Sequence, residues 1–257
     1  VTGDTATAKF IWTGVINEQI KAPPRFVEQG REYDQLMVRH WDQWETPGNY
    51  SRIFTVVLGA DGKLGMLGKA MDGNLVGDAP SKPFGGGEEV SWTADSSAVL
   101  FALRAADANE AKSTNLDIYR SSLSTNEVAN LTTDNLGTDT TPTASPDGKW
   151  LAWTSMARAT YEADRLVLKL MDVKTGKVTA LTDKWDRSVG SIAWAADSKS
   201  MLVTAQDVLE TPLYRVDLKG KVTRLTERGA QLVRNFRLIE QALEPALRRG
   251  ANLKALP

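Results

Sequence analysis

The chain has 257 residues, of which 42% are apolar and 25% are charged, and its 31 basic and 32 acidic side chains give a formal net charge of −1. This balance is typical of a soluble globular protein, and it lacks the basic excess that a nucleic-acid partner would favour. Cysteine is absent and His40 is the only histidine, which excludes disulfides, thiolate metal sites and the usual zinc ligand sets.

The first 30 residues give an ambiguous signal. Residues 10–16, FIWTGVI, could form a strand, and Pro23-Pro24 ends whatever precedes it. The start, VTGDTATAKF, has neither the basic nor the apolar part of a signal peptide and no initiator Met, so we interpret the chain as a processed product or a fragment. No apolar run reaches the roughly 20 residues that cross a bilayer, and we expect no membrane span.

Strand-like segments follow from residue 33. Residues 33–57 predict strands around Pro47-Gly48, and residues 52–68 predict a strand, the turn Asp61-Gly62 and a weaker strand. His40 lies in the first of these segments. We interpret it as a partly buried strand residue beside Trp41, because the histidine of a Ser-His-Asp triad would occupy a late loop.

One pattern then occurs three times, in SWTADSSAVLFAL (91–103), TASPDGKWLAWTS (143–155) and AWAADSKSMLVTA (193–205). Asp95, Asp147 and Asp197 take the same place, at spacings of 52 and 50 residues. An aspartate favours a tight turn there because its carboxylate can accept a downstream backbone N–H. The strand after each turn is apolar on both faces, which predicts that other structure covers it from both sides.

A second landmark follows each of these turns. Residues 116–132, 168–182 and 213–226 each read as a strand, a polar turn and a short strand that ends in Leu-Thr. The turns carry residues suited to tight hairpins, namely Thr125-Asn126, Thr175-Gly176 and Lys219-Gly220. Each unit therefore holds about four short strands in roughly 45–50 residues, a period typical of a propeller or solenoid.

Propeller geometry explains the apolar strands better than a solenoid does. A propeller blade is a four-stranded antiparallel sheet packed between two others, so its inner strands are covered on both faces. We therefore predict an all-β fold, a partial β-propeller over residues 1–230 with about four blades, in units that start near residues 53, 91, 143 and 193.

The last segment, residues 231–257, departs from the repeat. Leu232, Phe236, Ile239, Leu243 and Leu247 have helical spacing, which predicts a short C-terminal helix interrupted by Pro245. The next aspartate turn of the repeat does not occur there. An abrupt, arginine-rich tail is also typical of a frame-shifted or misjoined reading frame, so its origin stays open.

Six segments together resemble the propeller of bacterial prolyl oligopeptidase family serine peptidases, in the dipeptidyl aminopeptidase/acylaminoacyl-peptidase branch. They are YDQLMVRHWDQW, PFGGGEEVSWTADSS, KSTNLDIYR, YEADRLVLKLMD, DRSVGSIAWAADSK and TPLYRVD, which cover about residues 33 to 228 in order. The resemblance implies a non-catalytic propeller that gates an α/β-hydrolase domain, which follows in sequence and carries the Ser-Asp-His triad. It also implies cleavage of short peptides near their N-terminus and a periplasmic or secreted location, with the cytoplasm as the alternative.

Residues with catalytic or ligand-binding potential are few. The chain has no G-x-S-x-G motif, so we predict that it lacks the catalytic domain, and we assign it no catalytic, cofactor-binding or metal-ligating residue and no cofactor. Glu88-Glu89 could bind a peptide amine, but neighbouring residues on a strand point to opposite faces.

The tryptophans favour packing over a ligand cage. Trp92 and Trp194 share one repeat position, which Ala144 takes in the middle unit, and one residue per blade favours packing between blades. Trp41, Trp44 and Trp185 lie off this register; they are candidates for a pocket or a domain interface, with loop packing as the alternative.

Two functional hypotheses follow. In the first, the chain is the propeller part of a serine exopeptidase, inactive alone, that meets its peptide substrate through the missing hydrolase domain. In the second, it is a standalone propeller for protein binding or scaffolding, so whether it is part of an enzyme stays open. An open arc of about four blades leaves bare faces and edges, so we expect self-association or a tail that covers one face.

Overall fold

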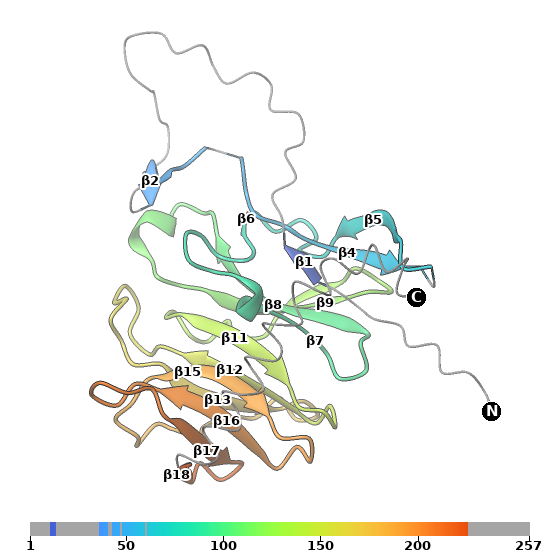
Figure 1. The fold of residues 1–257 in the computed structure, drawn as a ribbon. Coiled ribbons are helices and arrows are strands. Elements are labelled where there is room, and N and C mark those ends of the chain that lie inside the picture. The colour runs from blue at the N-terminus through green and yellow to red at the C-terminus, as the bar shows by residue number, and fades with distance from the viewer. Residues whose placement is uncertain (1–10, 14–35, 41–42, 47, 60, 226–257) are drawn as a thin grey trace, which may run out of the picture.

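A computed structural model describes residues 11–13, 36–40, 43–46, 48–59 and 61–225. Within them the fold is all-β and the sheets are antiparallel, with two short 3-10 helices, η1 (Gly87–Glu89) and η2 (Glu110–Lys112). Figure 1 shows three of the sheets stacked against one another, in the manner of propeller blades. The all-β prediction is confirmed in this part of the chain, whereas the predicted helix in residues 231–257 lies outside it.

The stacked sheets share one strand order. The first contains β7 (Val90–Trp92), β8 (Ala98–Ala105), β9 (Asp117–Ser122) and β10 (Val128–Asn130), and β6 (Gly77–Asp78) extends it by pairing with β8. The second contains β11 (Asp139–Ala144), β12 (Trp150–Ser155), β13 (Val167–Asp172) and β14 (Val178–Ala180). The third contains β15 (Val189–Trp194), β16 (Ser200–Ala205), β17 (Leu213–Asp217) and β18 (Val222–Arg224). Strand β11 contacts both β7 and β15, so the first strands of the three sheets lie together.

Strands upstream of the stack form two smaller sheets. Strands β1 (Ile11–Thr13), β4 (Ile53–Leu58) and β5 (Leu64–Ala70) make one, and β2 (Arg39–His40) and β3 (Gln43–Trp44) make the other. The predicted turn Asp61-Gly62 joins β4 to β5. After β5, Met71 N donates to Ile53 O at 2.7 Å, as Leu131 N donates to Ile118 O and Leu181 N to Leu168 O, both at 2.8 Å. Because the same hydrogen bond recurs after the fourth strand of the stacked sheets, β4 and β5 correspond to the third and fourth strands of the repeated unit.

The aspartate turns form as the sequence predicts. Each carboxylate accepts the backbone N–H two residues on, at 3.0 to 3.2 Å: Ser97 donates to Asp95, Lys149 to Asp147 and Lys199 to Asp197. The residue directly after each aspartate has a left-handed backbone, with φ of 56° at Ser96, 70° at Gly148 and 58° at Ser198. The turn therefore reverses the chain within a few residues, and the buried strand starts at once.

The Leu-Thr landmark ends the first two stacked units for a physical reason, while the third threonine lies outside the described residues. Thr132 Oγ1 accepts the Ile118 backbone N–H at 2.9 Å, and Thr182 Oγ1 accepts that of Leu168 at 2.9 Å. The fourth strand has only three residues, so the threonine hydroxyl satisfies a backbone donor of the third strand that the short neighbour leaves unpaired.

Burial along the second strands shows where each sheet lies in the stack. In β8, residues 98–103 are each 2% exposed or less, and in β12, residues 151–155 are each 3% exposed or less. Strand β16 instead alternates between buried Met201, Val203 and Ala205 and half-buried Leu202 and Thr204. The prediction of cover on both faces is therefore confirmed for β8 and β12 and fails for β16, because no further sheet of the described residues lies on its outer side.

Candidate functional site

The first strands of the stacked sheets line an open groove of about 410 Å³. Residues of η1, β7, β11 and β15 form its walls, so it lies where the three sheets meet. Val90, Pro142 and Ile192 give it an apolar surface. Each sheet also contributes hydroxyl side chains, so the groove can make both apolar and hydrogen-bonding contacts.

Two bulges shape the groove at equivalent places. The pairing of β11 with β12 shifts between Thr140 and Thr143, and that of β15 with β16 shifts between Val189 and Ile192. A bulge leaves one residue unpaired and turns its strand. The bulged strands are tied down by matched hydroxyl pairs, Thr141 Oγ1 with Thr154 Oγ1 at 2.8 Å and Ser191 Oγ with Thr204 Oγ1 at 2.9 Å.

Glu88 and Glu89 follow three consecutive glycines, residues 85–87, and lie in η1 rather than in a strand. Glu89 is 6% exposed, and its carboxylate accepts the Ser81 N–H at 2.7 Å, the Ser81 hydroxyl at 2.8 Å and the Thr140 hydroxyl at 3.2 Å. Burial raises the pKa of Glu89 although these three hydrogen bonds act in the other direction. The Thr140 bond joins the first stacked sheet to the second.

Glu88, in contrast, is exposed and lines the groove. The two carboxylates therefore do not converge on one point, and Glu88 alone is placed to meet a ligand. The absence of convergence agrees with the expectation from the sequence, whereas the predicted strand position of both residues is wrong, because they lie in η1. Three glycines followed by two acidic residues give no sequence signal that separates the buried carboxylate from the exposed one.

His40 lies in β2, partly buried. Burial, and next the positive charge of Arg104, lower its pKa. Within the described residues no hydrogen bond joins His40 to a serine hydroxyl. This agrees with its interpretation as a strand residue, while Trp41 lies outside the described part of the chain.

The tryptophans at the shared repeat position pack between sheets, as predicted. Trp194 Nε1 donates to Thr143 O of the neighbouring sheet at 3.2 Å, and Trp92 packs against the buried cluster that includes Phe101. Trp185 meets the Tyr214 ring edge-on at 4.8 Å between ring centres and, partly buried, packs against the core. Trp44 is 56% exposed, with the Arg39 guanidinium 5.7 Å from its ring centre.

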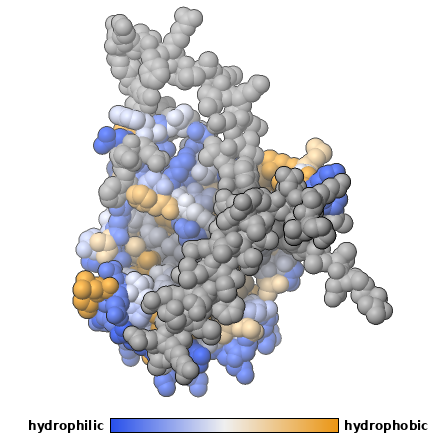
Figure 2. All heavy atoms as spheres, in the orientation of Figure 1, coloured by the Kyte–Doolittle hydropathy of each residue, from blue (hydrophilic) through white to orange (hydrophobic). Residues whose placement is uncertain are grey.

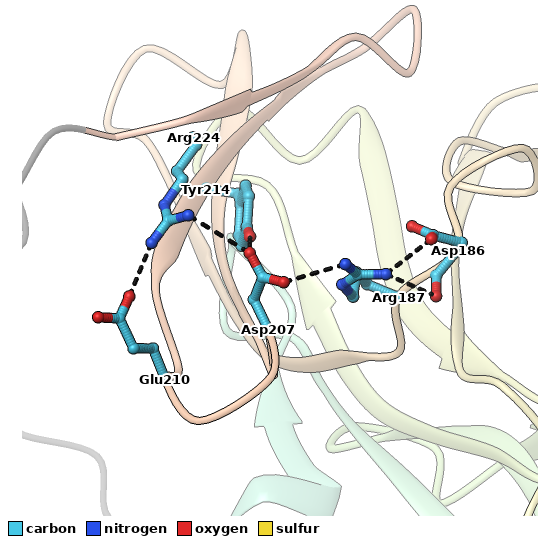
Figure 3. A network of polar contacts seen from close by, with 6 residues as sticks. All are labelled: Asp186, Arg187, Asp207, Glu210, Tyr214 and Arg224. Atoms are coloured by element: carbon cyan, nitrogen blue, oxygen red, sulfur yellow. Dashed lines mark hydrogen bonds and ion pairs between the residues drawn. The ribbon is translucent and has the colours of Figure 1, made fainter.

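A network of charged side chains surrounds the turn between β16 and β17, as Figure 3 shows. The Asp207 carboxylate accepts hydrogen bonds from Arg187 at 3.0 Å and Arg224 at 3.3 Å. The bond from Arg187 is the main reason that the pKa of Asp207 is lowered. Arg224 also pairs with Glu210 at 2.8 Å. No sequence pattern predicts this network, because its members come from three separate segments.

The tip of this turn is apolar and exposed. Val208 is 81% and Leu209 96% exposed, and the backbones of Asp207 and Glu210 bond to each other across the turn. In Figure 2 the turn forms a group of hydrophobic atoms at the left edge of the molecule. The charged network flanks this turn, although exposed ion pairs contribute little stability individually.

Two kinds of feature are absent from the described ranges: a cluster of side chains that could hold a metal ion, and a helix that could cross a membrane. Among these residues no group of three or more His, Asp or Glu side chains could hold a metal ion. None of the helices in this part of the chain has the length and apolar character needed to cross a bilayer.

Comparison with known proteins shows that the chain is similar in sequence to peptidases. No family model matches it. It is 36% identical over 200 residues to dipeptidyl-peptidase 5 of Porphyromonas gingivalis, covering 77% of this chain and 29% of that protein. It is 31% identical over 225 residues to dipeptidyl-peptidase 5 of Aspergillus fumigatus, covering 80% and 30%. The chain therefore spans about 30% of the length of these relatives.

Solved structures resemble it more weakly. The Pyrococcus horikoshii acylaminoacyl peptidase has a TM-score of 0.36 and 16% identity, covering 50% of this chain and 24% of that one. The β-propeller domain of the Trilobed protease from Pyrococcus furiosus has a TM-score of 0.35 and 21% identity, covering 51% and 40%. These scores are too low to carry an argument.

Proposed function

Because the chain is homologous to dipeptidyl-peptidase 5, of the prolyl oligopeptidase family, over its stacked sheets, we propose that it is the non-catalytic propeller portion of a serine exopeptidase that acts on short peptides. In this role it gates access of substrate to a hydrolase domain and is inactive alone. The observation that carries the proposal is the 36% identity over 200 residues, 77% of the chain. A periplasmic or secreted location belongs to the same proposal.

Together with this function, we propose that residues 1–230 form a partial propeller of about four blades. Three stacked sheets with one strand order support it, as does the correspondence of β4 and β5 to the last two strands of an earlier unit. In a propeller the first strands surround a central channel. The groove would then lie on the channel wall, along the path of a peptide substrate.

A second candidate function is a standalone module that binds another protein. The observation that favours it is the exposed pair Val208 and Leu209 on a turn flanked by charged residues, since adjacent exposed apolar groups are typical of interaction sites. Self-association through the outer side of the third stacked sheet, which lacks a covering sheet among the described residues, would be one form of this function.

One measurement tests whether the chain is inactive alone, and a second distinguishes the two candidates. The purified chain, incubated with fluorogenic dipeptide substrates, is expected to release no fluorophore above the level of heat-unfolded chain, and turnover would overturn the proposal. The chain is then mixed with a separately produced hydrolase domain of the Porphyromonas gingivalis relative. A change in the rate or peptide-length preference of that domain supports the gating role, and no change favours the standalone module.

A further inference from the structure

The turn between β16 and β17 has residues that suit neither its backbone nor its surroundings. Asp207 N donates to Glu210 O at 2.8 Å and Glu210 N donates to Asp207 O at 3.0 Å, so Val208 and Leu209 form a two-residue hairpin turn. Turns of this length need a left-handed backbone and favour Asn or Gly. Val208 nevertheless has a φ of 55°, which is an outlier for a β-branched residue.

Contact with solvent is equally unfavourable for these two residues. Val208 is 81% and Leu209 96% exposed. The left-handed residues of the aspartate turns and of the turns between third and fourth strands are instead small or polar, namely Ser96, Gly148, Ser198, Asn126, Gly176 and Gly220. Backbone strain and broken local rules are typical of functional sites. The conflict is resolved if another molecule buries Val208 and Leu209.

The charged network beside the turn indicates what that molecule is. Its ionisable groups form one row in which the signs alternate, as Figure 3 shows: Glu210, Arg224, Asp207, Arg187 and Asp186. The side chains at the two ends, Glu210 and Asp186, are 71% and 81% exposed, and that of Arg224 is 52% exposed. An alternating row is complementary to an antiparallel copy of itself shifted by one position. A partner of a single sign would meet repulsion along the same row.

From these features we propose that the turn is a contact between two copies of this chain, related by a two-fold axis near Leu209. In such an isologous contact both copies use the same patch, which must therefore carry both signs of charge around an apolar centre. Arg224 of one copy faces the partner's Asp207, and Glu210 faces the partner's Arg187. The two Leu209 side chains pack on each other at the centre.

The inference takes from the second candidate function only the choice of a protein as the ligand, and it applies equally to a peptidase propeller. It differs from association through the outer side of the third stacked sheet, because the turn lies at the end of that sheet, between its second and third strands. The contact area is small, so we expect a weak dimer, with a dissociation constant of about 10–100 μM.

Sedimentation velocity between about 5 and 500 μM chain, a range that spans this dissociation constant, tests the association. Leu209→Asn is expected to weaken it at least about tenfold, because each dimer loses two buried apolar side chains. The matched control is Val173→Asn, which is expected to stay within about twofold of the parent chain. Val173 is 52% exposed in the turn after β13. Antiparallel strands place this turn at the opposite end of the sheets from the turn after a second strand.

The chain has no cysteine, so one introduced cysteine reports on the symmetry of the contact. A residue beside a two-fold axis lies close to its own copy, and a disulfide forms where two Cα atoms lie within about 7 Å. Under mild oxidation, Leu209→Cys is expected to give disulfide-linked dimer at least about tenfold faster than Val173→Cys. Equal rates for the two variants overturn the inference.

Reversing one charge tests the row. Arg224→Glu brings like charges together across the axis and is expected to weaken association about five- to tenfold. Arg120→Glu, the same change at an exposed arginine in β9 of the first stacked sheet, is expected to have an effect of less than about twofold. Association of Arg224→Glu that is as tight as that of the parent chain overturns the two-fold arrangement.

Other occupants of the turn would give different results. A chain that stays monomeric up to about 500 μM overturns the inference, and so does association that survives Leu209→Asn, because it would use another surface. Binding of a monomeric chain to phosphatidylcholine vesicles, lost in Leu209→Asn, would assign the turn to a lipid surface and also overturns it. The proposed functions stand or fall separately, because the dipeptide and mixing assays decide them.

Discussion

Ser198 Oγ accepts a hydrogen bond from the backbone N–H of Asp147 at 3.0 Å, which joins the aspartate turn of one stacked sheet to that of the next. Ser198 follows Asp197 directly, is 4% exposed and has a φ of 58°. Ser198 thus has two roles. It adopts the left-handed backbone of its own turn, and it also satisfies a donor of the neighbouring turn.

Replacing this serine tests the link between sheets. Ser198→Ala keeps a side chain in the left-handed backbone but leaves the Asp147 N–H without its acceptor, so the free energy of unfolding is expected to fall by about 1–2 kcal/mol. Urea unfolding followed by tryptophan fluorescence measures it. The control Ser124→Ala, at an exposed turn, is expected to stay within about 0.5 kcal/mol of the parent chain. Equal stability of both variants would show that the link contributes nothing.

The Leu-Thr landmark is tested by removing one hydroxyl at constant shape. Thr182 is 1% exposed, and Thr182→Val would leave the Leu168 N–H buried and unpaired. We expect a loss of about 1–3 kcal/mol in unfolding free energy, measured in urea. Thr179→Val, on the exposed fourth strand of the same sheet, is the matched control and is expected to be nearly neutral. A similar loss in both variants would mean that the hydroxyl of Thr182 is not the cause.

The repeat was predictable from sequence because its signals are local. Asp147 bonds two residues downstream, and the apolar run after it is contiguous in the chain. Sequence reasoning therefore found the strands, the turns and the all-β class. It also assigned Trp194 to packing between sheets, because one tryptophan recurring at the same place in different units indicates a structural role.

The groove and the charged network were not predictable in the same way. Glu88 and Ser191 lie about 100 residues apart in the chain and share the groove only because the first strands converge. The burial of Glu89 depends on Ser81 and Thr140, which carry no local signal. The alternation in β16 reflects the position of its sheet at the end of the described stack rather than its own sequence.

Two glycines at the same turn position separate backbone strain from steric contact. Gly176 and Gly220 both have positive φ, 72° and 82°, but a Cβ on Gly176 would meet open space, whereas one on Gly220 would collide with the Leu181 carbonyl oxygen of the neighbouring sheet. Gly176→Ala is expected to lower the free energy of unfolding by about 1–2 kcal/mol, and Gly220→Ala is expected to lower it by about 3 kcal/mol or more, as measured by urea unfolding. Equal costs would show that the third sheet does not approach the second so closely.

The last prediction concerns pH. The pKa of Glu89 is raised in the folded chain, chiefly by burial, so the folded state binds this proton more tightly than the unfolded state does. The contribution of this group to stability is therefore full below the ordinary glutamate pKa and is lost as pH rises through the folded value. Glu89→Gln stays neutral at every pH, and its amide can still accept from Ser81 N–H. Its stability relative to the parent chain is expected to improve steadily from about pH 4 to pH 7.

Urea unfolding of the variant and the parent chain across that pH range gives the difference between their free energies of unfolding. Taking this difference cancels the pH dependence of all other groups. Glu127→Gln makes the same change of charge at an exposed position and is expected to give a much flatter difference. A Glu89→Gln difference that is constant with pH, or that falls as pH rises, would show that hydrogen bonds from Ser81 and Thr140 outweigh burial. The carboxylate would then favour its charged form in the fold, and its link between the first two stacked sheets would strengthen toward neutral pH.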